Sequence, residues 1–244
     1  PAGIAKQKNL SLVAGSESLF GQEYFNHSFF GVQFRLPNYG SFGLSVENFS
    51  VDYNGNSLSE ETSIGLHQGI TLSSDRNSTI SFGYGIKNYT VDYGSTAGVT
   101  GDGSDGIDLG SQSSLGIDIG LLASLADRIR FGAKAFNINS PTLGDANSAV
   151  RLPQRAQVGI AFSPYDLVWT TAALTKSAGH ASHFHGGMSY HILDNIFLRA
   201  GVMTNPNRFA TGFEVLIKRI RINYAFMTHP VLPLSHQISV EVVR

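Results

Sequence analysis

The chain has 244 residues, a net charge of −1, only 14% charged residues and no Cys. Near-neutrality removes the electrostatic case for nucleic acid, and the lack of Cys excludes a disulfide scaffold and a thiolate-ligated metal. The charged fraction is well below the roughly 25% of a soluble domain, and no apolar run approaches the ~18 residues of a membrane helix. Because the sequence starts at Pro1, we interpret it as a mature or trimmed fragment whose signal peptide has been removed.

Alternation of apolar with small or polar residues predicts about fourteen strands and almost no helix. Most of them approach the ~9 to 11 residues with which a tilted strand crosses a bilayer. The predicted strands are 10–15, 26–36, 41–53, 61–73, 79–93, 114–124, 128–138, 154–163, 166–176, 182–191, 195–204, 208–217, 219–227 and 234–243.

The connections between these strands alternate between tight turns and longer, Gly/Ser/Asn/Pro-rich segments. This alternation is typical of an outer-membrane barrel, which has short periplasmic turns and longer extracellular loops. An even strand number then puts both termini on the periplasmic side. The predicted loops are 16–25, 54–60, 94–113, 139–153, 177–181, 205–207 and 228–233.

A two-strand unit recurs along the chain. FGLSVENFSVDYNG (Phe42–Gly55) and FGYGIKNYTVDYGS (Phe82–Ser95) match at Phe, Gly, Asn, Val, Asp and Tyr, and FGAKAFNIN from Phe131 is a weaker copy. Such repetition is typical of an array of β-hairpins. In each copy the apolar alternation shifts by one residue, near Asn48 and Asn88 in the first two. The shift indicates a β-bulge or a strand leaving the lipid; the alternative is a lateral opening in the wall at Asn48 or Asn88.

The two faces of the strands differ in chemistry. One face carries Ile, Leu, Val and Phe, as lipid requires. The other carries charges that would be costly in a dry core but are tolerated in a wet or mutually paired lumen. The predicted lumen-lining residues are Arg35, Glu47, His67, Arg128, Arg130, Lys134, Arg155, Arg199, Glu214 and Arg221. We therefore predict an all-β fold, a single antiparallel transmembrane β-barrel that forms one domain over residues 1–244.

Several segments carry a family resemblance. PAGIA (Pro1–Ala5) looks like the NPAGLA entry of FadL-type outer-membrane barrels without its leading Asn. RLPQRAQVGIAFSP (Arg151–Pro164) and TGFEVLIKRIRINYAF (Thr211–Phe226), with LRAGVMTNP, PLSHQISVEV and the phrases at Asn48 and Asn88, resemble the PorV/PorQ-like branch of that superfamily. Two features depart from the pattern: the end, Val243–Arg244, lacks a terminal aromatic residue, and no N-terminal hatch precedes Pro1. Residues 1–9 then represent the remnant of a plug or entry segment.

The resemblance implies two roles, to which a third can be added. PorV-type barrels are partners in type IX secretion, where extracellular loops bind the translocon or its cargo. FadL-type barrels admit small hydrophobic molecules, such as fatty acids, and release them sideways into the membrane. A structural surface barrel is the third alternative. The charged lining favours the partner role over an apolar binding pocket, with loops 94–113, 139–153 and 228–233 as the contact surface.

Three patterns bear on chemistry. His183 and His185 share one strand face, as zinc ligands could, and Asp102, Asp105 and Asp108 lie in a Gly-rich loop that could hold calcium, although the EF-hand spacing is missing. We favour metal-free readings of both. No G-x-S-x-G motif occurs and no catalytic set can be assembled. We therefore expect neither an enzyme nor a cofactor.

Overall fold

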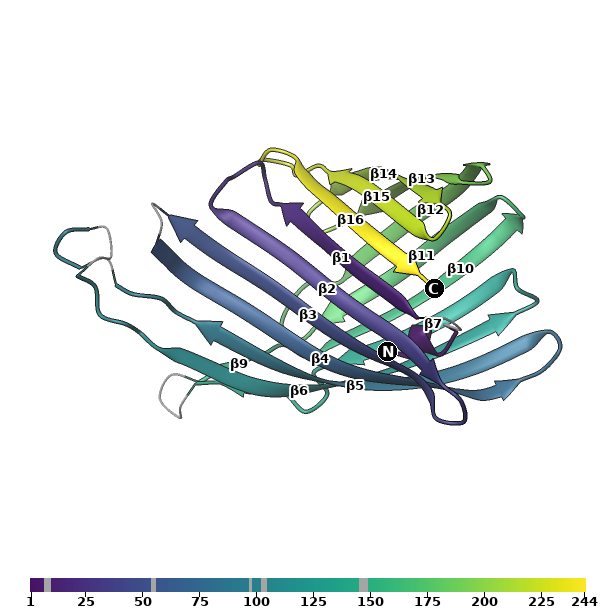
Figure 1. Ribbon diagram of the computed structural model, residues 1–244, viewed down its shortest axis with the longest axis horizontal. Coiled ribbons are helices and arrows are strands. Elements are labelled where there is room, and N and C mark those ends of the chain that lie inside the picture. Colours follow the sequence, from purple (N-terminus) through teal and green to yellow (C-terminus); the bar gives the residue numbers. More distant parts are fainter. Residues whose placement is uncertain (7–9, 54–55, 97, 102–104, 145–148) are drawn as a thin grey trace.

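The structure, a computed structural model, describes residues 1–6, 10–53, 56–96, 98–101, 105–144 and 149–244. Fourteen of the described strands close into one antiparallel barrel in the order β1-β16-β15-β14-β13-β12-β11-β10-β7-β6-β5-β4-β3-β2 (Figure 1). This confirms the predicted fold class. The strands are β1 (Ser11–Ser18), β2 (Phe25–Leu36), β3 (Gly40–Tyr53), β4 (Asn56–Ser74), β5 (Ser78–Asp92), β6 (Ser111–Leu125), β7 (Ile129–Phe136), β10 (Arg155–Tyr165), β11 (Val168–Ser177), β12 (His183–Leu193), β13 (Ile196–Met203), β14 (Arg208–Ile217), β15 (Ile220–Met227) and β16 (Ser235–Val243).

Three further elements lie outside the wall. The 3-10 helix η1 (Ala2–Lys6) precedes β1, and β8 (Thr142–Leu143) pairs with β9 (Val150–Arg151) inside the β7–β10 connection. Neither β8 nor β9 was predicted, since two residues carry no periodic signal. Among the described residues, no helix is long and apolar enough to cross a membrane.

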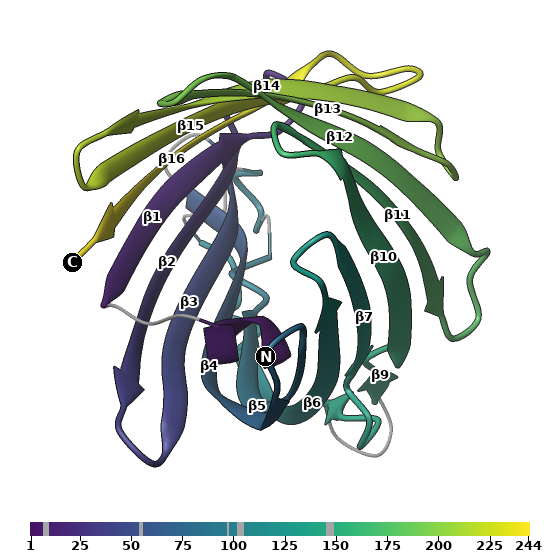
Figure 2. The ribbon, with the colours of Figure 1, turned by 90° about the vertical axis from the view of Figure 1, so that its right-hand side faces the viewer.

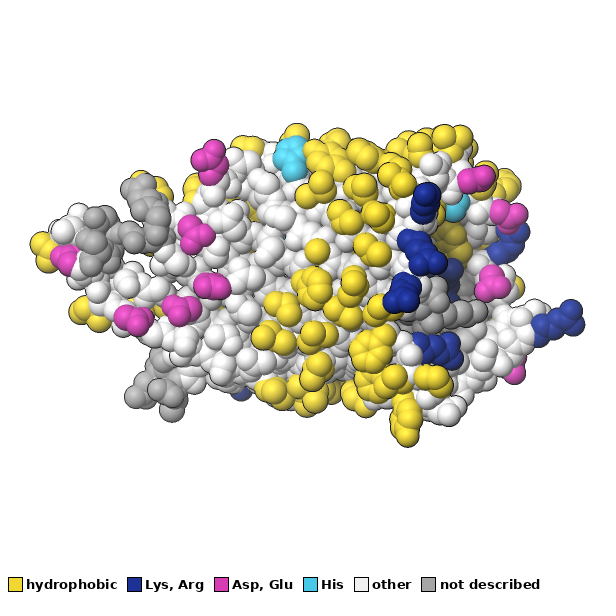
Figure 3. Space-filling model, in the orientation of Figure 1, with side chains coloured by type: hydrophobic (Ala, Val, Ile, Leu, Met, Phe, Trp, Pro, Cys, Tyr) yellow, Lys and Arg dark blue, Asp and Glu magenta, His cyan; other side chains and the backbone are white. Residues whose placement is uncertain are grey.

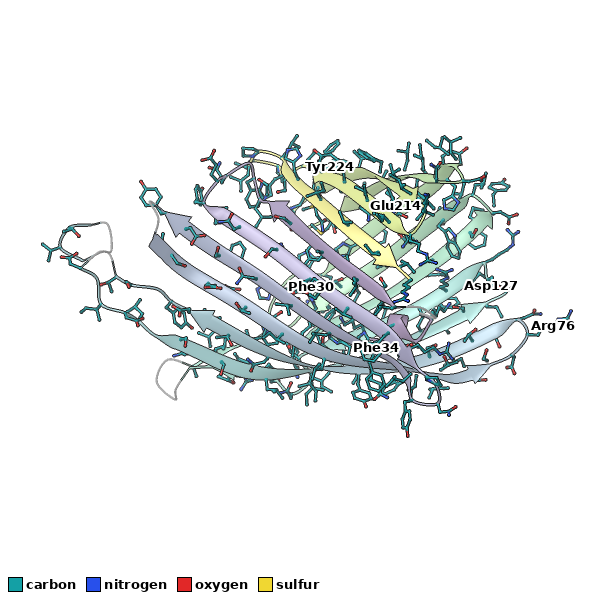
Figure 4. All side chains as sticks on the ribbon, viewed as in Figure 1. Phe30, Phe34, Arg76, Asp127, Glu214 and Tyr224 are labelled. Atoms are coloured by element: carbon teal, nitrogen blue, oxygen red, sulfur yellow. The ribbon has the colours of Figure 1, made fainter. Side chains whose placement is uncertain are left out.

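The two rims of the barrel differ. The short-turn rim is formed by connections of two or three residues, such as those that carry Arg76 and Asp127 (Figure 4). The long-loop rim, at the other end, is formed by the longer β1–β2, β5–β6 and β7–β10 connections. The predicted loop 54–60 is wrong in part, because β4 begins at Asn56 and pairs with the end of β3 through Val51 and Ser59.

β3 to β6 extend beyond the apolar band of the outer wall. In Figure 3 apolar side chains form a band across the visible face, closer to the short-turn rim, and the long-loop end of the same face is largely polar, with several acidic groups. Leu66, which lies between the exposed apolar residues Leu44 and Ile86 of the neighbouring strands, is 65% exposed. Further along the outer face, Asn48 donates to Glu60 (2.6 Å) and Thr62 (3.0 Å). Such a change from apolar to hydrogen-bonded polar side chains is expected where strands leave lipid.

The strand register excludes an opening at the two asparagines. Asn48 lies opposite Ser28 and Thr62, and Asn88 lies opposite Ile64 and Leu115, with no shift at either position. The proposed lateral opening and the proposed bulge at Asn48 and Asn88 are therefore both wrong. The apolar pattern shifts because the outer face becomes polar beyond the band, whereas Phe49 and Tyr89 are apolar residues of the inner face.

Candidate functional site

The N-terminal segment lies inside the barrel, where η1 contacts β3, β4, β5 and β6 (Figure 2). It rests on inward-facing glycines of three neighbouring strands. A Cβ added to Gly69 would lie 2.8 Å from the Ala5 nitrogen, and one added to Gly83 would lie 2.7 Å from Ala2 Cα. These distances are shorter than any real contact, so only glycine lets the helix approach the wall this closely.

Charged side chains on the inner face surround η1. The Asp118 carboxylate is completely buried. It accepts a hydrogen bond from the Asn137 backbone N–H (3.0 Å) and lies 3.9 Å from Lys134 Nζ. Lys87 Nζ lies 3.8 Å from Glu47. The buried carboxylate is thus compensated by a cation and a backbone donor, as a buried charge requires.

A second group, the ionic ladder, crosses the inner face from β13 to β1. Glu214 pairs with Arg199 and, at 3.0 Å, with Arg221. Arg221 also pairs with Glu241 at 2.8 Å, and Glu241 accepts the Ser11 hydroxyl at 2.6 Å. Because β1 and β16 are the first and last barrel strands, this chain of contacts runs across the seam that closes the barrel.

A third group, the cationic wall, is the inner face of β7, β10, β11 and β12. Arg130 lies over the Trp169 ring (4.1 Å), and Lys134 (3.6 Å) and Arg155 (4.0 Å) both lie against Phe136. Cation–π contacts hold these side chains against the wall. Lys134 also pairs with Asp118, whereas Arg130 and Arg155 have no ion-pair partner among the described residues. The two inward aromatic residues had not been predicted for the lumen. The available signal was alternation along each strand, which puts Phe136 on the face of Lys134 and Trp169 on the face of Thr175.

The β7–β10 connection covers part of the long-loop mouth. Leu143 of β8 is 5% exposed. With Leu152 it lines a cavity of about 240 Å³ whose other walls include Phe49, Tyr89 and Val91. These are the aromatic and apolar residues that caused the apparent phase shift. At this part of the mouth the inner face therefore presents apolar residues beside the carboxylates of Glu47 and Glu61, which line the same cavity.

Most of the predicted lumen-lining residues lie on the inner face, but two lie at the short-turn rim. Arg128 belongs to the β6–β7 turn and pairs with Asp166 of the β10–β11 turn at 2.8 Å. Its prediction as a lumen residue is wrong, because side chains alternate between the two faces only within a strand and Arg128 lies in a turn. Arg35, opposite Ser41 near the end of β2, is exposed. His67 is inward, with its Nε2 3.0 Å from the Ser45 hydroxyl.

The metal candidates do not converge. The described residues contain no group of three His, Asp or Glu side chains that could hold a metal. His183 contacts the Thr204 carbonyl through Nδ1 at 3.3 Å. Asp105 accepts hydrogen bonds from the Val99 backbone N–H and the Thr100 hydroxyl. Asp108 accepts a hydrogen bond from the Gly110 backbone N–H. The third loop aspartate, Asp102, lies outside the described residues.

Comparison with known proteins identifies a family and a fold. A family model described as "Type IX secretion system membrane protein PorP/SprF" matches residues 2–241. The model names neither PorV nor PorQ. The resemblance therefore predicted the right secretion system but the wrong family within it. A search of curated proteins found no match.

Solved outer-membrane barrels share the fold at low identity. The toluene transporter TodX of Pseudomonas putida is 12% identical with a TM-score of 0.58, over 100% of this chain and 91% of TodX. A Pseudomonas aeruginosa FadL homologue is 12% identical with a TM-score of 0.58, over 100% and 92%. Acinetobacter baumannii Omp33 is 6% identical with a TM-score of 0.59, over 98% and 100%. These matches bear on the fold alone.

Proposed function

Since the chain belongs to the PorP/SprF family of type IX secretion system membrane proteins, we propose that it is a non-enzymatic accessory barrel of a larger outer-membrane secretion complex. In this role it resembles the partner barrels of the PorV type. Its long-loop rim is the contact surface and is extracellular, and the first residue of β1 and the last residue of β16 lie at the periplasmic rim.

The observation that carries this proposal is the projection of β3 to β6 beyond the apolar band. This part of the wall is outside lipid and is still ordered by strand pairing, with one register shift between Val51 and Asp52, so it offers a rigid polar surface to a partner. At its edge, the β6 residues before Ile119 pair with β5 but not with β7. The β5–β6 and β7–β10 connections extend the same surface.

The test is affinity isolation of the tagged barrel from gently solubilised outer membranes, followed by mass spectrometry. We expect a larger type IX secretion component to be retained, and shortening of loop 94–113 or 139–153 to release it. The matched control shortens loop 228–233, the third loop predicted for the contact surface. This loop joins β15 to β16, away from the projecting strands, so we propose that it does not hold the partner. A barrel that is isolated alone, or a partner that all three loop variants retain equally, contradicts the proposed contact surface.

A second role, passage of small hydrophobic molecules, is favoured by one cavity. It measures about 360 Å³ and is lined by η1 and by small inner-face residues such as Gly120, Gly159 and Ala173. Structurally similar proteins include one titled a toluene transporter. Arg130, Lys134 and Gln157 also line the cavity, which makes it poorly suited to an apolar ligand. Uptake of a fatty acid or toluene into liposomes that carry the purified barrel, above the rate of protein-free liposomes, would support this role.

A further inference from the structure

The cationic wall differs from the rest of the lumen in having no carboxylate of its own. β7, β10, β11 and β12, all of whose residues are described, contain no Asp or Glu. The Arg residues of the ionic ladder, in contrast, are each paired with Glu. Lys134 is compensated by Asp118 of β6, but Arg130 and Arg155 have no ion-pair partner among the described residues. Unpaired cations inside a barrel attract anions, because low-dielectric walls focus the field.

A cavity of about 320 Å³ lies on this wall and is lined entirely by hydrogen-bonding side chains. They come from three neighbouring strands whose register places Arg155 opposite Ser177, Gln157 opposite Thr175, and Thr175 opposite His183. Side chains directly opposite one another share a face and lie within ~5.5 Å at Cβ. The lining residues are Arg155, Gln157, Thr175, Ser177, His183 and His185.

Arg155 is held in place but is left without an anionic partner. Its guanidinium stacks 4.0 Å from the Phe136 ring, and among the described residues no ion pair involves it. Stacking orients the plane of the guanidinium, and its N–H edge remains available for a bidentate contact with a carboxylate or phosphate.

Thr175 provides an independent sign of a missing ligand. The residue is only 8% exposed, and its hydroxyl has no hydrogen-bond partner among the described residues. Buried polar atoms without partners are rare in native proteins, and each needs an explanation. His183, which faces Thr175 across the strand pair, donates Nδ1–H to the Thr204 carbonyl, so Nε2 of the neutral ring is an acceptor that can bind a protonated ligand oxygen.

We propose that this cavity is an oxyanion-binding site for a carboxylate or phosphate group that enters from the long-loop rim. Arg155 begins β10, Ser177 ends β11 and His183 begins β12, so all three lie at the end of the wall nearest that rim. Arg155 supplies the charge-assisted fork, and the Thr175 hydroxyl and the Gln157 amide complete the donor set. The assignment does not depend on the accessory role, because it rests on the cavity alone.

The test is calorimetric titration of the purified full chain in detergent, with inorganic phosphate in one arm and acetate in the other. We expect Arg155→Gln to weaken binding about tenfold or more, because a charge-assisted contact is lost. Thr175→Val, which keeps the shape but removes the hydroxyl, should weaken it about threefold. Binding of phosphate, of acetate or of both supports the site, and comparison of the two arms shows which anion chemistry it prefers.

The matched control is Lys176→Gln, which removes one positive charge from the same strand, next to Thr175 but on the opposite face. Affinity should stay within about twofold of the unmodified chain, as expected for a change outside the cavity. His185→Gln serves as a second lining variant if Arg155→Gln fails to fold, as judged by heat-dependent gel mobility. The proposal is overturned if neither anion binds or if Arg155→Gln, or His185→Gln in its place, and Thr175→Val both bind normally. It is also overturned if Lys176→Gln weakens binding as much as these lining variants do.

Discussion

Glu214 is the residue on which the ionic ladder depends. It is 3% exposed and contacts both Arg199 and Arg221, so one buried carboxylate bridges two guanidinium groups, and Glu241 supplies the second negative charge. Figure 4 shows it at the barrel's upper wall, between strands of the C-terminal half. Removing one partner of a buried ion pair is much more costly than removing both, because an uncompensated charge remains.

We therefore expect Glu214→Gln to lower the free energy of unfolding by about 1–3 kcal/mol, since the amide keeps an acceptor but not the charge. Urea-induced unfolding in lipid vesicles, followed through the fluorescence of the single Trp169, measures this change. Glu23→Gln, in the exposed β1–β2 connection, is the control and should change stability by less than about 0.5 kcal/mol. Equal effects of the two substitutions would show that the ladder contributes nothing.

η1 illustrates an element whose place in the fold had no sequence signal. Five residues without periodicity predict nothing about location. The glycines that receive it, Gly43, Gly69 and Gly83, are far apart in sequence and become neighbours only through strand register. The sequence shows which residues of each strand face inward. It does not show which small inward residues of different strands lie side by side and leave room for η1. The interpretation of residues 1–9 as a plug remnant is compatible with this placement and stays a prediction.

We expect Gly83→Val to displace η1 from the wall, because the added side chain would occupy the space of Ala2. The chain has no Cys, so a single Ala5→Cys substitution gives a clean probe at a residue that is 6% exposed. Its labelling by a hydrophilic maleimide should become at least about tenfold faster in the Gly83→Val background, since local opening controls access to a buried site.

Gly132→Ala is the control for this experiment. It adds a methyl group to the same inner face at a position where the nearest atom would be 3.9 Å away. The labelling rate should not change. If Gly83→Val also leaves the rate unchanged, η1 does not depend on the glycine surface for its position.

At the scale of the whole barrel, alternation alone predicted the fold class, the strand number and most of the inner-face residues. It could not predict which inner residues pair, because the contacts from Arg199 to Glu241 join four strands through their register. It also misassigned the asparagines at 48 and 88. Apolarity marks the outer face only within lipid, and a sequence does not state where the lipid ends.

The position of the lipid boundary gives the last prediction. Leu66 and Leu58 are both exposed on β4, but Leu66 lies within the apolar band and Leu58 lies near the long-loop end of the strand. An Arg side chain on the lipid face costs ~2–4 kcal/mol at the bilayer midplane and ~0–1 kcal/mol near an interface. We therefore expect Leu66→Arg to lower the free energy of unfolding in vesicles by about 2–4 kcal/mol and Leu58→Arg by about 0–1 kcal/mol. The same substitution on the same strand isolates depth as the variable. If Leu58→Arg were as costly as Leu66→Arg, the outer end of β4 would lie in lipid, and the projecting surface on which the accessory role depends would not exist.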